Sequence, residues 1–180
     1  PSGTFTGLGI TDLGNGTATF NPAAAGSGLN IDITYAYSDA NFCISSQTKQ
    51  VDVHALPSVS ILDLESNYCV NDSPVIINGD PTPNAQTTGY YTGDGITDNG
   101  DGTALFAPNT LIAGNIYAIT YTYIDTNACE SSFLQNVNII ELPLAPSAGD
   151  KEVCFGLPVP DLTATGEPGF QLIWYNSIGD

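Results

Sequence analysis

The stretch Tyr-Ala-Ile-Thr-Tyr-Thr-Tyr (residues 117–123) has an aromatic or β-branched residue at every second position, with smaller residues between them. Successive side chains of a strand point to opposite faces, so this alternation predicts a strand with one buried face. The same pattern occurs earlier in the chain, at Ile31, Ile33, Tyr35 and Tyr37. No stretch shows a convincing helical period, and we therefore predict an all-β chain.

The two copies of this strand belong to a longer repeat. Residues 3–57 align without a gap with residues 89–143, at an offset of 86 positions, and about half of the aligned residues are identical. A fixed period of this size indicates tandem domains. Since a proline closes each copy, we predict three domains: the C-terminal part of a first repeat at 1–57, a complete repeat at 58–143, and the N-terminal part of a third unit at 144–180.

Each unit is expected to be an antiparallel β-sandwich of immunoglobulin type, because six or seven short strands alternate with turns rich in Gly, Pro and Asn. The joints at residues 55–58 and 141–144 are short and contain proline, which makes a stiff connection. At about 3.3 Å per strand residue, one sandwich is about 35–40 Å long, so we expect a rod. Trp174 is predicted as a core residue of the third unit.

The chain is strongly acidic, with 19 Asp and Glu residues against two Lys residues and a net charge of −17. This charge argues against binding to nucleic acid or to anionic membrane surfaces, both of which require Lys and Arg. It favours solubility and self-repulsion along a filament. With 42% hydrophobic residues the chain is not expected to be disordered.

Several motifs resemble those of a known family. Residues 68–75 (Tyr-Cys-Val-Asn-Asp-Ser-Pro-Val), 93–97, 106–108 and 119–129 are similar to the Ig-like repeats of very large Bacteroidetes cell-surface adhesins of the gliding-motility type, which the type IX secretion system exports. Residues 153–166 resemble a second Ig-like type found in the same proteins. The resemblance implies an extracellular, non-catalytic protein at the cell surface without a cofactor. The implied partners are neighbouring repeats, the secretion or gliding machinery of the outer membrane, and an extracellular surface or polysaccharide.

The first functional hypothesis is thus a stalk segment of a large adhesin that serves surface adhesion and gliding motility. Stiff joints, disulfides and like charge would keep such a stalk extended. The alternative is a carbohydrate- or protein-binding module, or a spacer domain, of a secreted multi-domain enzyme.

The four cysteines follow the repeat, since Cys43 corresponds to Cys129 and Cys69 to Cys154. No two of these cysteines are close in the sequence, as the ligands of a zinc site would be. Two interpretations remain, namely one disulfide per repeat or buried free thiols. We predict a bond between Cys69 and Cys129, the only two that belong to one whole unit. Strand order places them at opposite ends of a standard sandwich, however, and such bonds would then join neighbouring repeats.

No catalytic, cofactor-binding or metal-binding residue is predicted. His54 is the only histidine, and we interpret it as a residue that is tolerated at the end of a strand. The acidic loop with Asp94, Asp98 and Asp101 lacks the order of a calcium loop, and we interpret it as a solvated hairpin with calcium as the alternative. Tyr90 is predicted to be exposed, but a single exposed tyrosine gives little support for a carbohydrate-binding surface.

Overall fold

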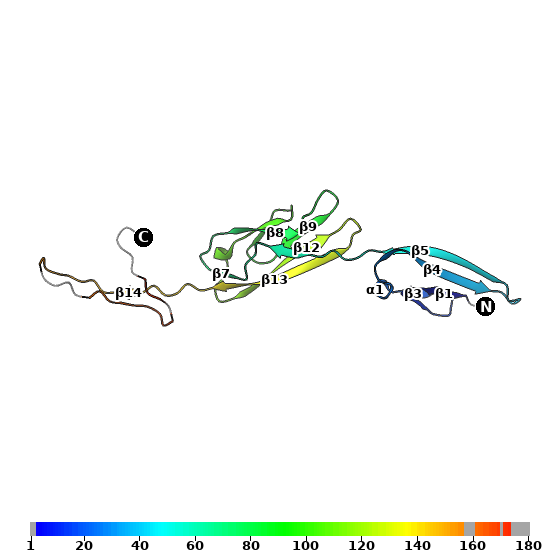
Figure 1. The fold of residues 1–180 in the computed structure, drawn as a ribbon, viewed down its shortest axis with the longest axis horizontal. Helices are drawn as coiled ribbons and strands as arrows, with labels where there is room; N and C mark the ends of the chain where they lie inside the picture. The colour runs from blue at the N-terminus through cyan, green and yellow to red at the C-terminus, as the bar shows by residue number, and fades with distance from the viewer. Residues whose placement is uncertain (1–2, 157–160, 170, 174–180) are drawn as a thin grey trace.

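The computed structural model describes residues 3–156, 161–169 and 171–173. Figure 1 shows three groups of strands along the longest axis of the chain, which we call the first part (residues 3–53), the second part (residues 60–140) and the third part (residues 147–165). Strands make up nearly all of the regular structure, and this confirms the all-β prediction.

The second part is a sandwich-like pair of four-stranded sheets, with the strand orders β10-β11-β8-β6 and β7-β13-β12-β9. Every pairing in the two sheets is antiparallel except that of β7 with β13. The elements are β6 (Ser60–Leu62), β7 (Asn67–Cys69), β8 (Val75–Asp80), β9 (Thr88–Thr92), β10 (Ile96–Asp98), β11 (Thr103–Phe106), the 3-10 helix η1 (Pro108–Thr110), β12 (Ile116–Ile124) and β13 (Glu130–Ile140).

The core of the second part lies between these sheets. The predicted core residues are confirmed, because Ile119, Tyr121 and Val137 are 0% exposed and Tyr123 is 7% exposed. The ring of Tyr121 packs on that of Tyr91 with 4.7 Å between centroids, and its hydroxyl donates a hydrogen bond of 2.7 Å to the Pro81 carbonyl. Burial raises the pKa of Tyr121 to about 12, so this phenol stays neutral in the core.

The first part repeats a portion of this sandwich. It contains the sheet β1-β4-β5 and the hairpin β2-β3. The pairing of β1 with β4 sets Phe5 opposite Tyr35, as Tyr91 lies opposite Tyr121 in the second part. The elements are β1 (Thr4–Gly7), β2 (Ile10–Asp12), β3 (Ala18–Phe20), the helix α1 (Pro22–Ala25), β4 (Gly28–Ser38) and β5 (Ile44–Val53).

Counterparts of β6, β7 and β8 would align ahead of residue 3, so one face of the first part is open. The side chains that are buried in the second part are therefore only half-buried at the same positions in the first part. This holds for Phe5, Phe20, Ile33, Tyr35, Val51 and Val53.

The described residues of the third part form the two-residue strands β14 (Ser147–Ala148) and β15 (Ala164–Thr165), which pair antiparallel. The predicted third unit at 144–180 also includes 157–160, 170 and 174–180. These residues, and with them the prediction for Trp174, lie outside the described part of the chain.

One hydroxyl in the core of the second part has no partner among the described residues. Tyr91 is 4% exposed and its hydroxyl oxygen makes no hydrogen bond. A buried polar group without a partner costs about 1–3 kcal/mol. The first part has Phe5 at the same position of the repeat.

We therefore expect Tyr91→Phe to stabilise the second part by about 1 kcal/mol, because the mutation removes an unsatisfied group and keeps the ring. Urea unfolding followed by circular dichroism measures the change. The matched control is Tyr121→Phe, which loses the bond to Pro81 and should destabilise by about 1–2 kcal/mol. A loss of stability in Tyr91→Phe as large as that in Tyr121→Phe would contradict this assignment.

Candidate functional site

The ends of the repeats carry the cysteines and the joints, and each end has a defined local structure. In the turn between β12 and β13, an Asp125 carboxylate oxygen accepts hydrogen bonds from the backbone N–H of Asn127 at 2.8 Å and of Cys129 at 2.9 Å. The first part repeats this turn, with Asp39 accepting from Asn41 and Cys43 at the same distances. The shared motif Asp-x-Asn-x-Cys is therefore a folded turn that fixes the backbone of the cysteine.

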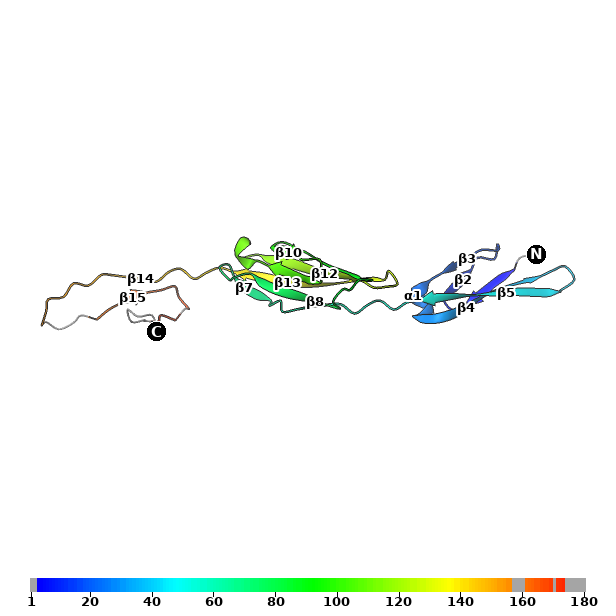
Figure 2. The same cartoon turned by 90° about the horizontal axis from the view of Figure 1, so that it is seen from above.

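The turn of the second part lies next to the first part. The hairpin tip between β12 and β13 points along the connecting segment toward α1 and the end of β5 (Figure 2). The hydrogen bond from Cys129 holds the pKa of Asp125 below its usual value, with Asn127 and the His54 imidazole acting in the same direction. Cys129 is half-buried, whereas Cys43 at the outer end of the first part is exposed.

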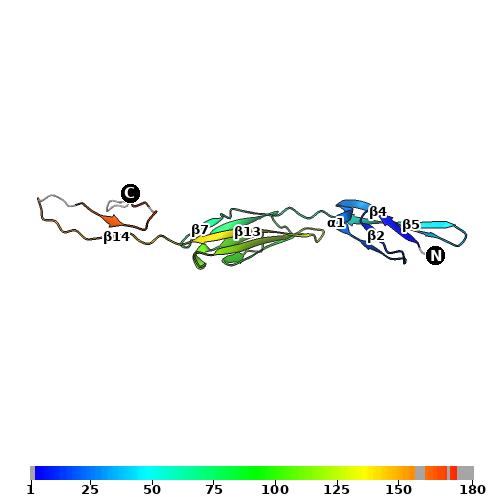
Figure 3. The same cartoon turned by 90° about the horizontal axis from the view of Figure 1, so that it is seen from below.

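Cys69 lies at the other end of the second part. It is the last residue of β7, which runs parallel to the end of β13, and its register partner is Ile140 (Figure 3). The Cys69 N–H donates to the Asp72 carboxylate at 2.7 Å, and the Val70 N–H donates to the Ile140 carbonyl at 3.0 Å. These bonds fix the turn from β7 toward β8 at the end that faces the third part.

This placement corrects the predicted bond between Cys69 and Cys129. Both thiols are free. Cys129 directly precedes Glu130, the first residue of β13, while Cys69 pairs with Ile140, the last residue of the same strand. The full length of β13, about 35 Å at 3.3 Å per residue, separates them, whereas a disulfide needs Cα atoms within about 7 Å. The alternative, in which such bonds join neighbouring repeats, stays a prediction.

The other candidates do not come together as a site. Within residues 3–156, 161–169 and 171–173, no three His, Cys, Asp or Glu side chains are grouped so that they could hold a metal ion. Asp101 accepts hydrogen bonds from the Thr103 side chain at 2.6 Å and backbone N–H at 3.0 Å, which lower its pKa. The hairpin interpretation of this loop is consistent with these bonds. Among the described residues, no helix has the length and apolar character needed to span a membrane.

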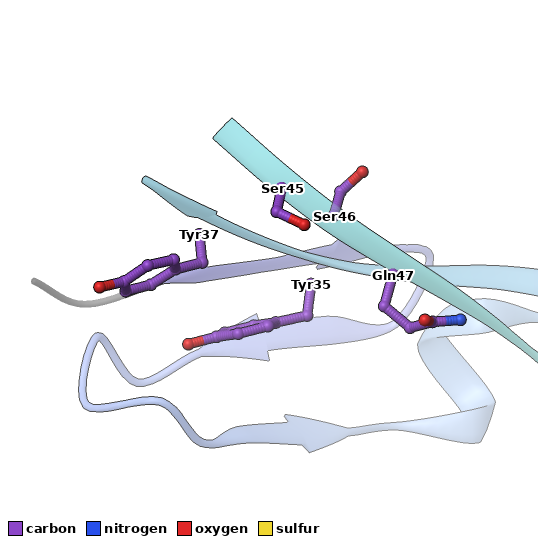
Figure 4. A pocket seen from close by; sticks show the side chains of 5 residues that line it. All are labelled: Tyr35, Tyr37, Ser45, Ser46 and Gln47. Atoms are coloured by element: carbon purple, nitrogen blue, oxygen red, sulfur yellow. The ribbon is translucent and has the colours of Figure 1, made fainter. Parts of the chain in front are cut away.

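A hollow of about 240 Å³ in the first part has a lining that could be mistaken for a sugar site. Figure 4 shows the Tyr35 and Tyr37 side chains extending from β4 to the same side, and Ser45, Ser46 and Gln47 of β5 complete the lining. In the second part the corresponding Tyr121 is covered, since its ring lies against Gly79 and its hydroxyl bonds to Pro81. The hollow thus marks the place that the end of β8 fills in the second part.

A second hollow, of about 350 Å³, lies where the first part faces the joint. Its lining includes Pro22 and Ala23 from α1, Val53 at the end of β5, and His54, which directly follows β5. The corresponding residues of the second part are Pro108, Asn109, Ile139 and Ile140. Those residues belong to η1 and the end of β13, and β7 lies against both elements. The second hollow therefore marks the place that β7 fills in the second part.

A scan against protein-family models and a search of curated proteins both found no match to this chain.

Proposed function

We propose that the chain is a non-catalytic stalk segment of a large extracellular adhesin, in which immunoglobulin-type sandwiches follow one another as a rod. Surface adhesion and gliding motility are the proposed setting. The unit boundaries are those of the repeat, at residues 57 and 143. The partners of each unit are its neighbouring repeats, and the cell surface is the proposed location.

The strand order of the second part supports the immunoglobulin assignment. The sheet β6-β8-β11-β10 corresponds to the A-B-E-D sheet of that fold, and β9, β12 and β13 correspond to C, F and G. Near the start of β12, the Tyr117 hydroxyl donates to the Ile112 carbonyl at 3.2 Å and accepts from the Ile112 N–H at 3.0 Å. A tyrosine at this place that bonds to the backbone just upstream is a hallmark of such sandwiches.

The observation that carries the stalk proposal is that the chain enters and leaves the second part at opposite ends. β6 begins beside the joint with the first part, and β13 ends beside the third part (Figure 1). Repeats connected in this way extend the chain with every unit instead of folding back. The six residues 54–59 between β5 and β6 span at most about 20 Å and contain Pro57, which limits bending. The net charge of −17 adds repulsion between units.

Small-angle X-ray scattering tests the stalk proposal. The chain should give the profile of a rod, and each additional copy of residues 58–143 in a longer tandem should increase the maximum dimension by about 35–40 Å. Antibodies raised against the second part should also label intact cells of the source organism. A compact particle whose dimension does not grow with repeat number would exclude the stalk. Saturable binding of a polysaccharide would instead favour the binding-module alternative.

A further inference from the structure

The two cysteine positions of the repeat come to the same joint when repeats follow in line. In the second part, Cys69 lies at the end where the chain leaves the sandwich, and Cys129 lies at the end that faces the preceding unit. A cysteine at the Cys69 position of one repeat therefore faces the Cys129 position of the next. The length of β13 separates the two cysteine positions of one repeat and places one at each end of the sandwich. Where two repeats follow each other, the Cys69 position of the first and the Cys129 position of the second therefore lie on the two sides of the joint.

The first part has a vacant place for the strand that would carry this cysteine. The hollow lined by Pro22, Ala23, Val53 and His54 corresponds to the place of β7. In the second part Cys69 is the register partner of Ile140, and His54 is the matching residue of the first part. Neighbouring strands lie about 4.8 Å apart, so a β7 counterpart seated in this hollow would hold its cysteine beside His54.

The hairpin tip of the second part reaches this place. The residues 54–59 form a short connection, and the turn that contains Asp125 and Cys129 extends along it toward α1 (Figure 2). Hydrogen bonds from Cys129 and Asn127 lower the pKa of the Asp125 carboxyl, and the charge of His54 contributes in the same direction. Asp125 in turn accepts the hydrogen bond of the Cys129 N–H at 2.9 Å. The Cys129 backbone is thus fixed within the turn that points toward the joint.

We propose that a disulfide locks each joint, in which the cysteine at the Cys69 position of one repeat bonds to the cysteine at the Cys129 position of the repeat that follows. The two thiols lose two protons and two electrons, and an oxidising disulfide such as oxidised glutathione takes them up and gives two reduced thiols. By this rule Cys129 bonds to a cysteine at the Cys69 position of the repeat before it, and Cys69 bonds to a cysteine at the Cys129 position of the repeat after it. This inference rests on the proposed in-line arrangement of repeats.

The test completes the first repeat with the chain's own sequence. A copy of residues 58–88 is placed directly before Gly3, in place of residues 1–2. This junction is in register, because Gly3 aligns with Gly89 in the ungapped alignment of the two repeats. The extended chain then carries a copy of Cys69 in the first repeat, opposite Cys129. It is oxidised with a mixture of oxidised and reduced glutathione, and the remaining free thiols are blocked with N-ethylmaleimide before the protein is unfolded.

Trypsin provides the readout, because Lys49 and Lys151 are the only Lys or Arg residues and residues 58–88 contain none. Cleavage after Lys49 separates the copied cysteine from Cys129. If the disulfide has formed, these two fragments stay together on a non-reducing gel and separate after reduction. The linked peptides are then identified by mass spectrometry.

Three variants show which thiols take part. Cys129→Ser should abolish the link between the fragments, whereas Cys43→Ser and Cys69→Ser at its original position should leave it unchanged. A link that persists in Cys129→Ser, or free thiols throughout in a chain that gives the circular dichroism of a folded β protein, would overturn the proposal. If scattering shows a rod and no link forms, the disulfide is wrong and the stalk proposal stands.

A second measurement does not depend on how the added segment folds. In the 180-residue chain, His54→Cys should be joined to Cys129 by a short bismaleimide and should not be joined to Cys43, which lies at the far end of β5. Failure to cross-link position 54 to Cys129 would show that the hairpin tip does not reach the joint, and it would overturn the proposed bond.

Discussion

Replacing Gly79 with alanine is expected to destabilise the second part by about 3 kcal/mol, the upper end of the usual cost of overpacking a core. A Cβ at this position would lie closer than 3.0 Å to three ring carbons of Tyr121. The ring cannot move away, because it is 0% exposed, is packed on Tyr91 and is held by its hydrogen bond to Pro81. Urea unfolding of the second part, followed by circular dichroism, measures the loss.

Gly149→Ala is the matched control for this mutation. A Cβ at Gly149 would have no neighbour within 4 Å, and the φ of Gly149 lies outside the left-handed region. The urea midpoint for unfolding of the second part should therefore be the same in Gly149→Ala as in the unmodified chain. An unfolding midpoint of Gly79→Ala equal to that of the unmodified chain would mean that the Tyr121 ring does not lie against β8.

Replacing Phe106 with alanine should cost about 3–5 kcal/mol, as is usual for a large aromatic side chain removed from a core. Phe106 is 0% exposed, and its ring meets that of Tyr68 edge to face with 5.2 Å between centroids. The mutation therefore leaves a cavity between β11 and β7. The unfolding free energy of the second part, from urea titration, gives the magnitude.

The repeat supplies the control, because Phe20 occupies the same position in the first part. It is only half-buried there, since no counterpart of Tyr68 covers it. Phe20→Ala should thus cost clearly less than Phe106→Ala. Equal losses at the two positions would contradict the conclusion that the first part is open on this face.

The sequence was sufficient to predict the all-β character and the core strand of the second part. A period of two over residues 117–123 is a strong signal, and Ile119, Tyr121 and Tyr123 lie in the core as predicted. β7 was missed because its three residues are too few to show a period. Its place depends on parallel pairing with a strand about 70 positions away in the sequence, which local patterns do not reveal.

The short helix α1 was also missed, although a local signal exists. Asn21 precedes Pro22, and its side chain accepts hydrogen bonds from the N–H groups of Ala23 and Ala24. Asn at the N-cap followed by Pro at the first helical position is a helix-start signal. The second repeat has Ala107 at the cap position and Asn109, Thr110 and Leu111 in place of the three alanines of α1, and it forms only the 3-10 helix η1. Loss of the cap and of two of the three alanines to the weaker helix formers Asn and Thr agrees with this difference.

The predicted site failed for a different reason. Cys69 and Cys129 were paired because they belong to one repeat, but their positions along β13 decide whether they can meet. The strand order predicted from the sequence placed the two cysteines at opposite ends of the sandwich, and the structure has them there. The two hollows of the first part had no signal in the sequence, since identical residues such as Tyr35 and Tyr121 differ only in what covers them.

The parallel pairing of β7 with β13 determines how the second part responds to tension. If residues 58 and 143 are pulled apart, β7 is drawn toward one end of the sandwich and β13 toward the other. The bonds between them, from Asn138 N–H to Ser66 carbonyl at 2.9 Å and from Val70 N–H to Ile140 carbonyl at 3.0 Å, are then loaded in shear and at the same time. A hairpin pulled from its open end unzips one bond after another, whereas these strands slide only when their bonds break together.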